Sequence, residues 1–403
     1  MDNYYPIRLL GEVCAIGDGA HAKVARQDSG RMYLTSKNIG QGTLILDKVD
    51  YISGDDFERI FPKNSSATRR AQKGDILIGI IGTFGNAYLY EEVDSFGVSS
   101  SIALLRPDPN VLLPEFLLYV VKSNFFKDVH QAYKSGSVQG YTNIPTIKRL
   151  PIPLPPLPTQ RLIASVLASL DDKIELNRRM NATLEALAAA LFKHWFVDNP
   201  EAEGWEDIEL GQFADIIDCL HTKKPDRQEE GKPLLQLWNI LDNGLLDMTD
   251  TYYITEERYY VWVSRIEASP GDCVITNTGR VAAVAQIPEG FKAALGRNMT
   301  GIRCKKEFPY PTFLLECLLS DLMKQEIHRN TDVGTILDSL NVRNIPKLRF
   351  KLPTNPLLQN FEQTVRPVRV MMEKNLEQSR TLAALRDTLL PRLMRGEVRV
   401  SEL

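Results

Sequence analysis

The sequence lacks the features that mark secreted, membrane-spanning and zinc-binding proteins. Its first residues contain no basic leader followed by an apolar core, and no window approaches the roughly 18 apolar residues of a membrane span. Its 5 cysteines include no CxxC pair, and no histidine lies at zinc-ligand spacing from them. We therefore expect a cytoplasmic chain with reduced, structural thiols, no membrane association and no metal site.

Short motifs of several enzyme classes are also absent. The chain contains no GxGxxG, no GxxxxGK[ST] and no HExxH, so neither a dinucleotide site, a P-loop nor a zinc-protease helix is expected. Asn199-Pro200-Glu201 departs from the Asn-Pro-Pro-aromatic sequence that amino-methyltransferases use. Paired acids such as Asp55-Asp56 are expected on solvated faces or at helix ends rather than in a catalytic dyad. The sequence thus predicts no catalytic residues.

Charge of one sign is not in excess. Lys and Arg total 48 against 51 Asp and Glu, which gives a formal net charge of −3 at pH 7. Because neutralisation of phosphates supplies most non-specific affinity for DNA, we do not expect this chain to bind DNA tightly on its own. With 43% hydrophobic and 25% charged residues, it is expected to fold into packed domains.

What the sequence does have is an internal repeat of about 200 residues. Leu10-Gly11 aligns with Leu210-Gly211 at an offset of 200, and Leu154-Pro155 aligns with Leu352-Pro353 at an offset of 198. Further matches keep the same order: Asp18 with Asp218, His21 with His221, Lys23 with Lys223, Asn38-Ile39 with Asn239-Ile240, Gly74-Asp75 with Gly271-Asp272, and Asn177 with Asn375. Since this order never breaks, we interpret the chain as a duplicated unit rather than as a chance alignment.

Both copies have the same internal plan. Short β-like runs such as Asp75 to Gly82 and Asp272 to Thr276 lie between Gly, Asp and Asn turns. A helix-like stretch follows near 115–134 in the first copy and near 312–329 in the second. The proline-rich segment 150–158 is expected to be an extended connector rather than a helix. This plan predicts one globular α/β body in each copy.

A long helical pattern follows each body. Residues 159–197 fit a heptad repeat whose positions recur after a shift of 198, with Arg386 as an imperfection in the second copy. Thr159 and Asn355 are the expected N-caps, and Pro367 and Pro391 are expected to kink or fray the second helix. About 40 residues at a rise of 1.5 Å each make a helix of roughly 60 Å. We expect an antiparallel pair with the same pseudo-twofold symmetry as the bodies.

Asn177 and its repeat partner Asn375 occupy the apolar positions of these helices. A polar residue at such a position selects one alignment of two helices at a cost in stability. We therefore predict that Asn177 and Asn375 lie close to the pseudo-twofold axis and determine the register of the helix pair. The alternative is that both face solvent.

Polar loops recur in both bodies and favour a role in DNA recognition. Arg, Asn and Gln can bind base edges through two hydrogen bonds, whereas Lys and Ser/Thr mainly contact phosphates. The alternative for each loop is that it is an ordinary surface loop. We therefore expect only a subset of these loops to contact DNA. The candidates are Lys23, Lys37, Asn38, Arg69, Arg70, Asn86, Gln139 and Tyr141 in the first body and Lys223, Lys224, Trp238, Asn239, Asn277, Arg280, Arg297 and Asn298 in the second.

Three segments at the ends of the helical stretches resemble one known family, the specificity subunits of type I restriction-modification systems. Residues 155–160, Pro-Pro-Leu-Pro-Thr-Gln, are similar to the Pro-Pro-Leu-x-Glu-Gln that begins the family's first helix. Residues 191–198 and 389–398 resemble the ends of its two helices. Thr159 replaces the family's Glu, and 352–357 retain little of the motif, so the resemblance does not define the start of the second helix.

The resemblance covers essentially the whole chain and implies an α+β fold. It implies two pseudo-symmetric α/β target-recognition domains separated by two long antiparallel, coiled-coil-like helices. The domains would be 1–155 and 199–352, and the helical spacers 156–198 and 353–403.

The resemblance also implies a non-catalytic subunit that needs no cofactor itself. Each domain would recognise one half of a bipartite, asymmetric site in double-stranded DNA, while the helices set the gap and bind two modification subunits. Those partners would use S-adenosylmethionine, and restriction subunits would add ATP and Mg. Two alternatives stay open: a self-sufficient DNA methyltransferase or nuclease, which the absent motifs disfavour, and a helical scaffold that does not recognise DNA.

Overall fold

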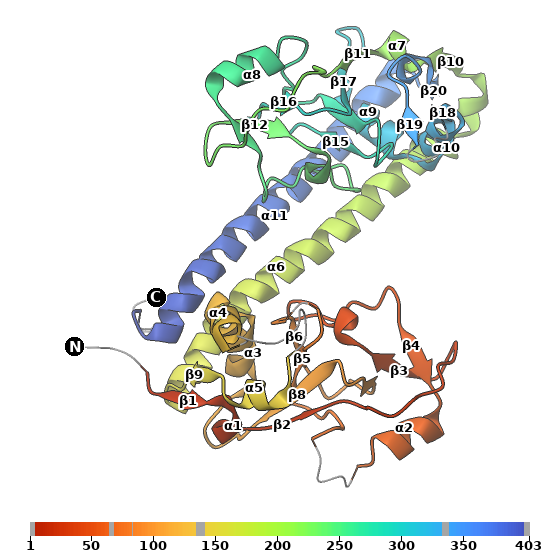
Figure 1. Ribbon diagram of the computed structural model, residues 1–403. Coiled ribbons are helices and arrows are strands. Elements are labelled where there is room, and N and C mark those ends of the chain that lie inside the picture. Colours follow the sequence, from red (N-terminus) through yellow and green to blue (C-terminus); the bar gives the residue numbers. More distant parts are fainter. Residues whose placement is uncertain (1–4, 64–67, 83, 134–141, 333–337, 399–403) are drawn as a thin grey trace. The chain divides into compact units, whose positions relative to one another are not determined.

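The computed structural model describes residues 5–63, 68–82, 84–133, 142–332 and 338–398 (Figure 1). The chain divides into two compact units. The first consists of Met1–Lys173 and Leu382–Leu403, and the second of Ile174–Thr381. Each unit thus contains one α/β body and a stretch of both long helices. Among the described helices, none combines the length and the apolar character that a membrane crossing needs.

The body of the first unit is built on a four-stranded antiparallel sheet and a three-stranded mixed sheet. The larger sheet has the order β2 (Cys14–Asp18), β8 (Ile102–Pro107), β5 (Ile76–Gly79), β6 (Ala87–Leu89). The smaller sheet has the order β4 (Asp50–Ile52), β3 (Arg31–Leu34), β7 (Gly97–Val98), in which β3 and β7 are parallel. A short pair, β1 (Ile7–Leu9) with β9 (Pro151–Pro153), joins the beginning of the body to its end.

The second unit repeats this topology strand for strand. Its larger sheet has the order β11 (Ala214–Asp218), β17 (Met299–Cys304), β14 (Cys273–Thr276), β15 (Val284–Gln286). Its smaller sheet has the order β13 (Tyr253–Ile254), β12 (Lys232–Leu235), β16 (Ala294–Leu295), again with the last two strands parallel. The closing pair is β10 (Glu206–Glu209) with β20 (Arg349–Leu352), and one further pair joins β18 (Thr331–Asp332) to β19 (Ser339–Leu340).

One inner strand of each larger sheet, β5 or β14, is buried on both faces. In β5, Ile76 and Ile78 belong to one apolar cluster and Leu77 to another. Because successive side chains of a strand point to opposite faces, these two clusters cover the two sides of the sheet. In β14, Cys273 and Val274 alternate between two clusters in the same way. The continuous apolar runs of the sequence therefore correspond to strands at the centre of the core.

In both units, a buried aspartate lies directly before this inner strand: Asp75 before β5 and Asp272 before β14. The Arg106 guanidinium donates two hydrogen bonds of 2.8 Å to Asp75, and Arg303 donates bonds of 2.8 and 2.6 Å to Asp272. Asp75 and Asp272 are buried, and each also accepts a backbone N–H from its own turn. Paired, bidentate geometry is what allows a charged carboxylate to lie inside a fold.

Short helices cover the sheets of both units. The first unit contains α1 (Leu10–Val13), the 3-10 turn η1 (Ser36–Asn38), α2 (Gly54–Ile60), α3 (Pro114–Lys122), α4 (Asn124–Tyr133) and α5 (Ile144–Lys148). The second contains η3 (Pro200–Gly204), α7 (Leu210–Phe213), η4 (Leu237–Asn239), α8 (Glu256–Trp262), α9 (Pro311–Leu319), α10 (Asp321–Arg329) and η5 (Ile345–Lys347).

The helix-like stretch expected in each body is in fact two helices. Ser123 separates α3 from α4, and Ser320 separates α9 from α10, both with extended backbone angles. The Ser123 hydroxyl accepts the N–H of Phe126, and the Ser320 hydroxyl accepts the N–H of Met323, each at 3.2 Å. A serine that caps a new helix in this way ends the preceding one, which the apolar periodicity of the sequence did not reveal.

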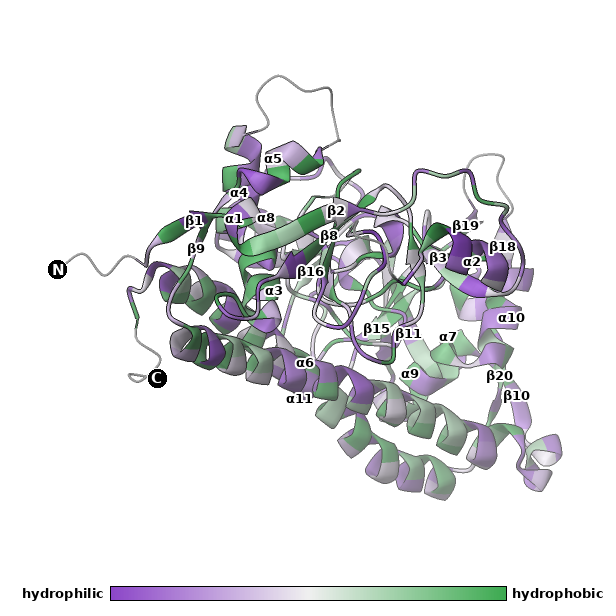
Figure 2. Cartoon of the chain, turned by 90° about the horizontal axis from the view of Figure 1, so that it is seen from below, coloured by the Kyte–Doolittle hydropathy of each residue, from purple (hydrophilic) through white to green (hydrophobic). Residues whose placement is uncertain are grey.

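The long helices are α6 (Leu157–Phe192), continued by the π-helical turn η2 (Lys193–Val197), and α11 (Asn355–Arg395). Both carry alternating polar and apolar residues along their length, as the mixed colouring in Figure 2 shows. The expected N-caps were wrong, since Thr159 lies inside α6 and Asn355 is already the first residue of α11. Prolines in a first turn are tolerated because the N–H that they lack has no partner there.

Two other expectations about these segments need correction. The proline-rich segment is not purely an extended connector, because Pro151–Pro153 forms β9 and Leu157 already belongs to α6. The expected fraying at Pro367 and Pro391 does not occur, because α11 continues through both positions. Buried residues on either side of the prolines, among them Val365 and Leu389, hold this helix by packing.

A polar side chain of each long helix binds the beginning of a helix in the adjoining body. Gln160 is fully buried, accepts the N–H of Leu113 at 2.9 Å, and donates to the carbonyls of Val111 and Pro155 at 2.8 Å. In the second unit, Glu362 accepts the N–H of Thr312 at 3.0 Å. One backbone N–H at the beginning of α3 and one at the beginning of α9 thereby gain a partner.

Within the first unit, Arg386 of α11 has a partner on α6. Its guanidinium donates to Asp171 at 2.7 Å, and Lys122 and Tyr119 of α3 bond to the same carboxylate at 3.1 Å. Burial acts to raise the pKa of Asp171, but Lys122 and Arg386 outweigh it and hold the pKa below its usual value. The imperfection of the heptad pattern at Arg386 is therefore an ion pair between the helices.

Within the second unit, three asparagines connect α6 to α11. Asn177 donates to the carbonyl of Asn375 at 3.3 Å, Asn375 donates to the side chain of Asn181 at 2.9 Å, and Asn181 donates to the carbonyl of Met372 at 3.0 Å. Residue numbers rise along α6 as they fall along α11, so the helices are antiparallel here. All three asparagines are buried, so Asn177 and Asn375 do not face solvent. That they determine the register stays a prediction.

Replacing Asn177, Asn181 and Asn375 together by leucine is expected to raise the melting temperature, because an apolar contact replaces a buried polar one. The Asn375→Leu variant alone is expected to lose about 1–3 kcal/mol, because Asn181 then keeps a buried acceptor without its donor. Thermal unfolding followed by circular dichroism measures both effects. Spin-label distances between α6 and α11 should broaden in the triple variant only.

The matched control is Asn360→Leu, at an exposed position of α11, which should change neither quantity. A triple variant that melts earlier while its spin-label distances stay sharp would contradict the register role.

Candidate nucleic-acid interface

An asparagine side chain closes the loop that follows β3 in the first unit. The Asn38 carbonyl oxygen accepts the N–H of Thr35 at 3.0 Å. Its amide group donates to the carbonyls of Ile45 and Lys48 at 3.0 and 2.9 Å. Asn38 is buried, whereas its neighbour Lys37 is exposed. The side chain predicted to contact DNA is thus used to close the loop, and the residue before it is presented to solvent.

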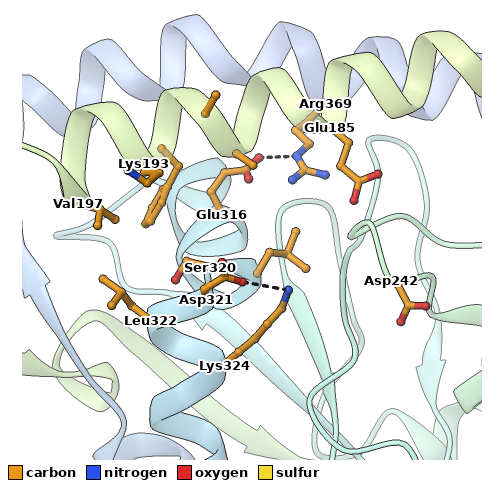
Figure 3. Close-up of a pocket in the computed structure, with 14 residues that line it drawn as sticks. Glu185, Lys193, Val197, Asp242, Glu316, Ser320, Asp321, Leu322, Lys324 and Arg369 are labelled. Carbon is orange, nitrogen blue, oxygen red and sulfur yellow. Dashed lines mark hydrogen bonds and ion pairs between the residues drawn. The ribbon is translucent and has the colours of Figure 1, made fainter.

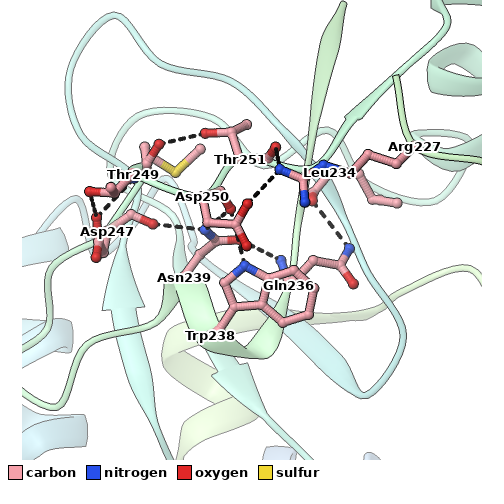
Figure 4. Close-up of polar contacts among 10 residues, drawn as sticks. Arg227, Leu234, Gln236, Trp238, Asn239, Asp247, Thr249, Asp250 and Thr251 are labelled. Atoms are coloured by element: carbon pink, nitrogen blue, oxygen red, sulfur yellow. Dashed lines mark hydrogen bonds and ion pairs between the residues drawn. The ribbon is translucent and has the colours of Figure 1, made fainter. Parts of the chain in front are cut away.

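Asn239 does the same after β12 in the second unit (Figure 4). It accepts the N–H of Gln236 at 2.8 Å and donates to the carbonyls of Asp247 and Asp250 at 2.7 and 3.3 Å. Asn239 is buried, and its neighbour Trp238 has 49% of its surface exposed. We call Asn38 and Asn239 the loop-closing asparagines. Because an amide has an acceptor oxygen and two N–H donors in a fixed plane, one side chain binds all three backbone groups at once.

Further candidates of the first unit also have partners inside the fold. The Arg70 guanidinium donates to Glu58 at 2.8 Å and to the carbonyl of Phe61 at 2.6 Å. Asn86 donates to the carbonyl of Ile39 at 3.0 Å and accepts from Gln41 at 2.7 Å. These polar atoms are already engaged, so we assign Arg70 and Asn86 to the support of the loops.

Two candidates of the second unit follow the same pattern. Asn277 is buried, donates to the carbonyl of Leu340 at 3.2 Å and accepts the Thr300 hydroxyl at 3.0 Å. Arg280 bonds to the carbonyl of Ile240 and to the carboxylate of Asp242. Both side chains connect neighbouring loops to the sheet rather than point freely outward.

The remaining candidates of the first unit are Lys23, Lys37, Arg69, Gln139 and Tyr141. Lys23 and Lys37 are exposed, while Arg69 is partly buried and its Nε has no partner among the described residues. Gln139 and Tyr141 lie outside the described residues. The first unit therefore keeps Lys23 and Lys37 as its exposed candidates.

In the second unit, exposed candidates gather around an open hollow. Of the described residues, His221, Thr222, Lys223, Arg297 and Asn298 line it, and none of these is acidic. Asn298 has a φ of +66°, a left-handed conformation that asparagine tolerates better than most residues and that shapes the turn beside Arg297. Lys223 and Arg297 place two basic side chains on a concave surface, which suits this hollow to a phosphate.

Lys224 lies beside the hollow with its ammonium over two aromatic rings. Its Nζ is 3.9 Å from the ring centre of Tyr252 and 5.2 Å from that of Trp238. Burial, followed by the nearby charges of Arg297 and Arg227, lowers the pKa of Lys224. The attraction between the cation and the ring faces holds Lys224 against Trp238.

One group in the second unit has metal-ligating side chains. Donor atoms of Asp218, Cys219 and His221 lie within 4.8 Å of one another. Arg265 already donates to the Asp218 carboxylate at 3.4 Å and to the Cys219 carbonyl at 3.0 Å. Burial raises the pKa of the Cys219 thiol, which disfavours the thiolate that a metal needs. We therefore assign no metal to this group.

A cavity of about 430 Å³ lies beside α6 in the second unit (Figure 3). Both apolar and charged side chains from α6, η2, α9 and α10 line it, among them the ion pair of Arg369 with Glu316. Arg369 donates to Glu316 at 2.5 Å and to the carbonyl of Asn243 at 2.6 Å, and both charged side chains are almost fully buried. This pair holds α9 and the loop at Asn243 against α11, which is a structural role.

Comparisons with known proteins agree on one family. A family model described as the type I restriction modification DNA specificity domain matches residues 8–186. The type I restriction enzyme HindI specificity subunit of Haemophilus influenzae is 24% identical over 409 residues, covering 82% of this chain and 88% of that protein. The MjaIX specificity subunit of Methanocaldococcus jannaschii is 27% identical over 373 residues, covering 86% of this chain and 80% of that protein.

The fold is also shared with a solved structure. The crystal structure of a type I restriction-modification S subunit from M. genitalium aligns with a TM-score of 0.58 and 16% sequence identity. The alignment covers 98% of this chain and 97% of that one. The fold class expected from the sequence, α/β bodies combined with long helices, is therefore confirmed.

The Asn239→Ala variant is expected to open the loop of residues 239–250. The substitution removes three hydrogen bonds and leaves backbone groups without partners. Each buried group left in this way lowers the free energy of unfolding by about 1–3 kcal/mol. Hydrogen–deuterium exchange of the backbone amides in 236–250 should rise at least tenfold. The Asn298→Gly variant, which preserves a positive φ at an exposed position, should leave this exchange unchanged. Equal exchange in both variants would contradict the role given to Asn239.

Proposed function

We propose that the chain, which belongs to the specificity subunits of type I restriction-modification systems, recognises an asymmetric, bipartite DNA sequence with one half-site for each α/β unit. These subunits are non-catalytic, and the catalytic activities of their systems lie in partner subunits. The chain therefore acts with DNA and with other restriction-modification subunits. A self-sufficient methyltransferase or nuclease is not favoured.

The observation that supports two different half-sites is a shared scaffold with different exposed side chains. Both units have the same strand order and the same loop-closing asparagine. The exposed residue before that asparagine is Lys37 in one unit and Trp238 in the other. Counted from the equivalent strands β7 and β16, Arg297 corresponds to Ser100. Two similar bodies with different contact residues suit an asymmetric site.

We propose the domain boundaries on the same basis. Target recognition is assigned to 1–155 and 199–352, and the helical spacers to 156–198 and 353–403. From the candidates we retain as DNA contacts the side chains that are exposed or beside the hollow, namely Lys23, Lys37, Lys223, Lys224, Trp238, Arg297 and Asn298. The buried asparagines and the paired arginines support these contacts instead of making them.

Two modification subunits are proposed to bind the long helices. Three leucines of α6, Leu162, Leu176 and Leu187, are exposed to 53, 52 and 45%. Leu176 and Leu187, both in the second unit, are 11 residues apart, close to three turns at 3.6 residues each, so they lie on the same side of the helix. We take these exposed leucines as docking positions for a protein partner.

These partners would supply what the chain does not have. Its net charge of −3 provides little general attraction for DNA, so much of the phosphate contact falls to the modification subunits. They would bring S-adenosylmethionine and methylate a flipped adenine, and restriction subunits would add ATP- and Mg-dependent translocation and cleavage. A cytoplasmic location follows from this role.

Methylation mapping tests the proposed function. A host genome is mapped with the modification subunits present, once with this chain and once without it. We expect a single bipartite motif to be methylated only when the chain is present, because the partners alone have no target. As a control, the purified chain with S-adenosylmethionine should neither methylate nor cleave DNA.

Two results would contradict the proposal. Methyl transfer or cleavage by the purified chain would show that the chain is itself an enzyme. Sequence-specific methylation that does not depend on the chain would favour the alternative that the chain is a helical scaffold without a role in DNA recognition.

A further inference from the structure

The indole of Trp238 differs from the other exposed candidates because its one polar group is already used. Its Nε1–H donates to the carbonyl of Asp250 at 3.0 Å, within the loop that Asn239 closes (Figure 4). This bond fixes the orientation of the ring. What Trp238 offers to solvent is therefore apolar, although 49% of its surface is exposed.

The surroundings of Trp238 hold the ring in one place. Lys224 lies 5.2 Å from its ring centre, and Arg227 bonds to the Asp250 carboxylate and, at 3.0 Å, to the carbonyl of Thr251. Asn239 follows directly and is buried. A rigid, outward-facing aromatic side chain is a common property of contact residues, because it loses little conformational entropy on binding.

An apolar ring distinguishes base pairs differently from a hydrogen-bonding side chain. In the major groove, A·T and G·C pairs present donors and acceptors, and the apolar group among them is the C5-methyl of thymine. A residue without a free donor or acceptor can therefore recognise a base edge there only through that methyl. Lys37, at the equivalent position of the first unit, has an ammonium instead and would bind a phosphate or a guanine.

We infer that Trp238 is a specificity-determining residue of the second unit that contacts the C5-methyl of one thymine in its half-site. This inference rests on the proposed function, since it presupposes that the second unit binds duplex DNA. Lys224, beside the ring, and Arg297, in the hollow, contact the adjacent phosphates. The ring selects the base, and the cations contribute affinity that does not depend on sequence.

The test uses the complex of the chain with its modification subunits. The DNA duplexes contain the motif identified by methylation mapping. In each duplex, one thymine of the second half-site is replaced by deoxyuridine, which removes only the methyl group. At one thymine, the unaltered complex should lose about fourfold in affinity, the factor that burial of one such group supplies. The Trp238→Ala complex should bind the thymine duplex more weakly and show no further loss with deoxyuridine.

Matched variants separate this contact from general effects. Trp238→Phe keeps an apolar ring and should retain part of the deoxyuridine loss. Arg297→Ala should weaken binding to all duplexes alike, reduce the salt slope by about one unit, and preserve the fourfold loss. Tyr260→Ala removes another exposed aromatic ring, on α8, and should leave the loss unchanged. The melting temperature of each variant shows whether the fold is intact.

Different outcomes identify which idea fails. A second half-site without thymine, or a deoxyuridine loss that persists in the Trp238→Ala complex, overturns the role of Trp238 while specific binding remains. If the unaltered complex shows no preference for the motif over unrelated duplexes, the proposed function itself fails.

Discussion

The arrangement of the proposed interface depends on one buried amide in each unit. The loop-closing asparagines Asn38 and Asn239 each bind three backbone groups and so fix a loop of about ten residues to the sheet. Such bonds are costly to break, because the backbone groups would be left buried without partners. The residue before the asparagine is held outward whatever its side chain, which allows Lys37 in one unit and Trp238 in the other.

The rest of each body keeps this loop on a rigid support. An inner strand buried on both faces, and a buried Asp–Arg pair directly before it, occur in both units. Gln160 and Glu362 connect the long helices to the N-termini of α3 and α9. Arg70 and Arg280 also hold the loops in place through their hydrogen bonds, although composition alone would class them as polar surface residues. Recognition and folding are thus assigned to different residues of the same loops.

Some of this organisation was predictable from the sequence, and some was not. The duplication and the α/β and helical composition follow from residue order and periodicity, which survive as long as the fold does. The inward orientation of Asn38 and Asn239 did not follow, because an asparagine that closes a loop and one that binds a base look alike in a sequence. The pairing of Arg386 with Asp171 joins residues 215 positions apart, a distance over which spacing carries no signal.

The proposed recognition of one half-site by each unit has a direct consequence for chimeric chains. The decisive experiment replaces residues 1–155 with those of a related specificity subunit that has a different target, and maps the motif that the resulting complex methylates. We expect one half of the motif to change, while the other half and the gap between them are retained. A change in both halves, or in neither, would contradict this proposal.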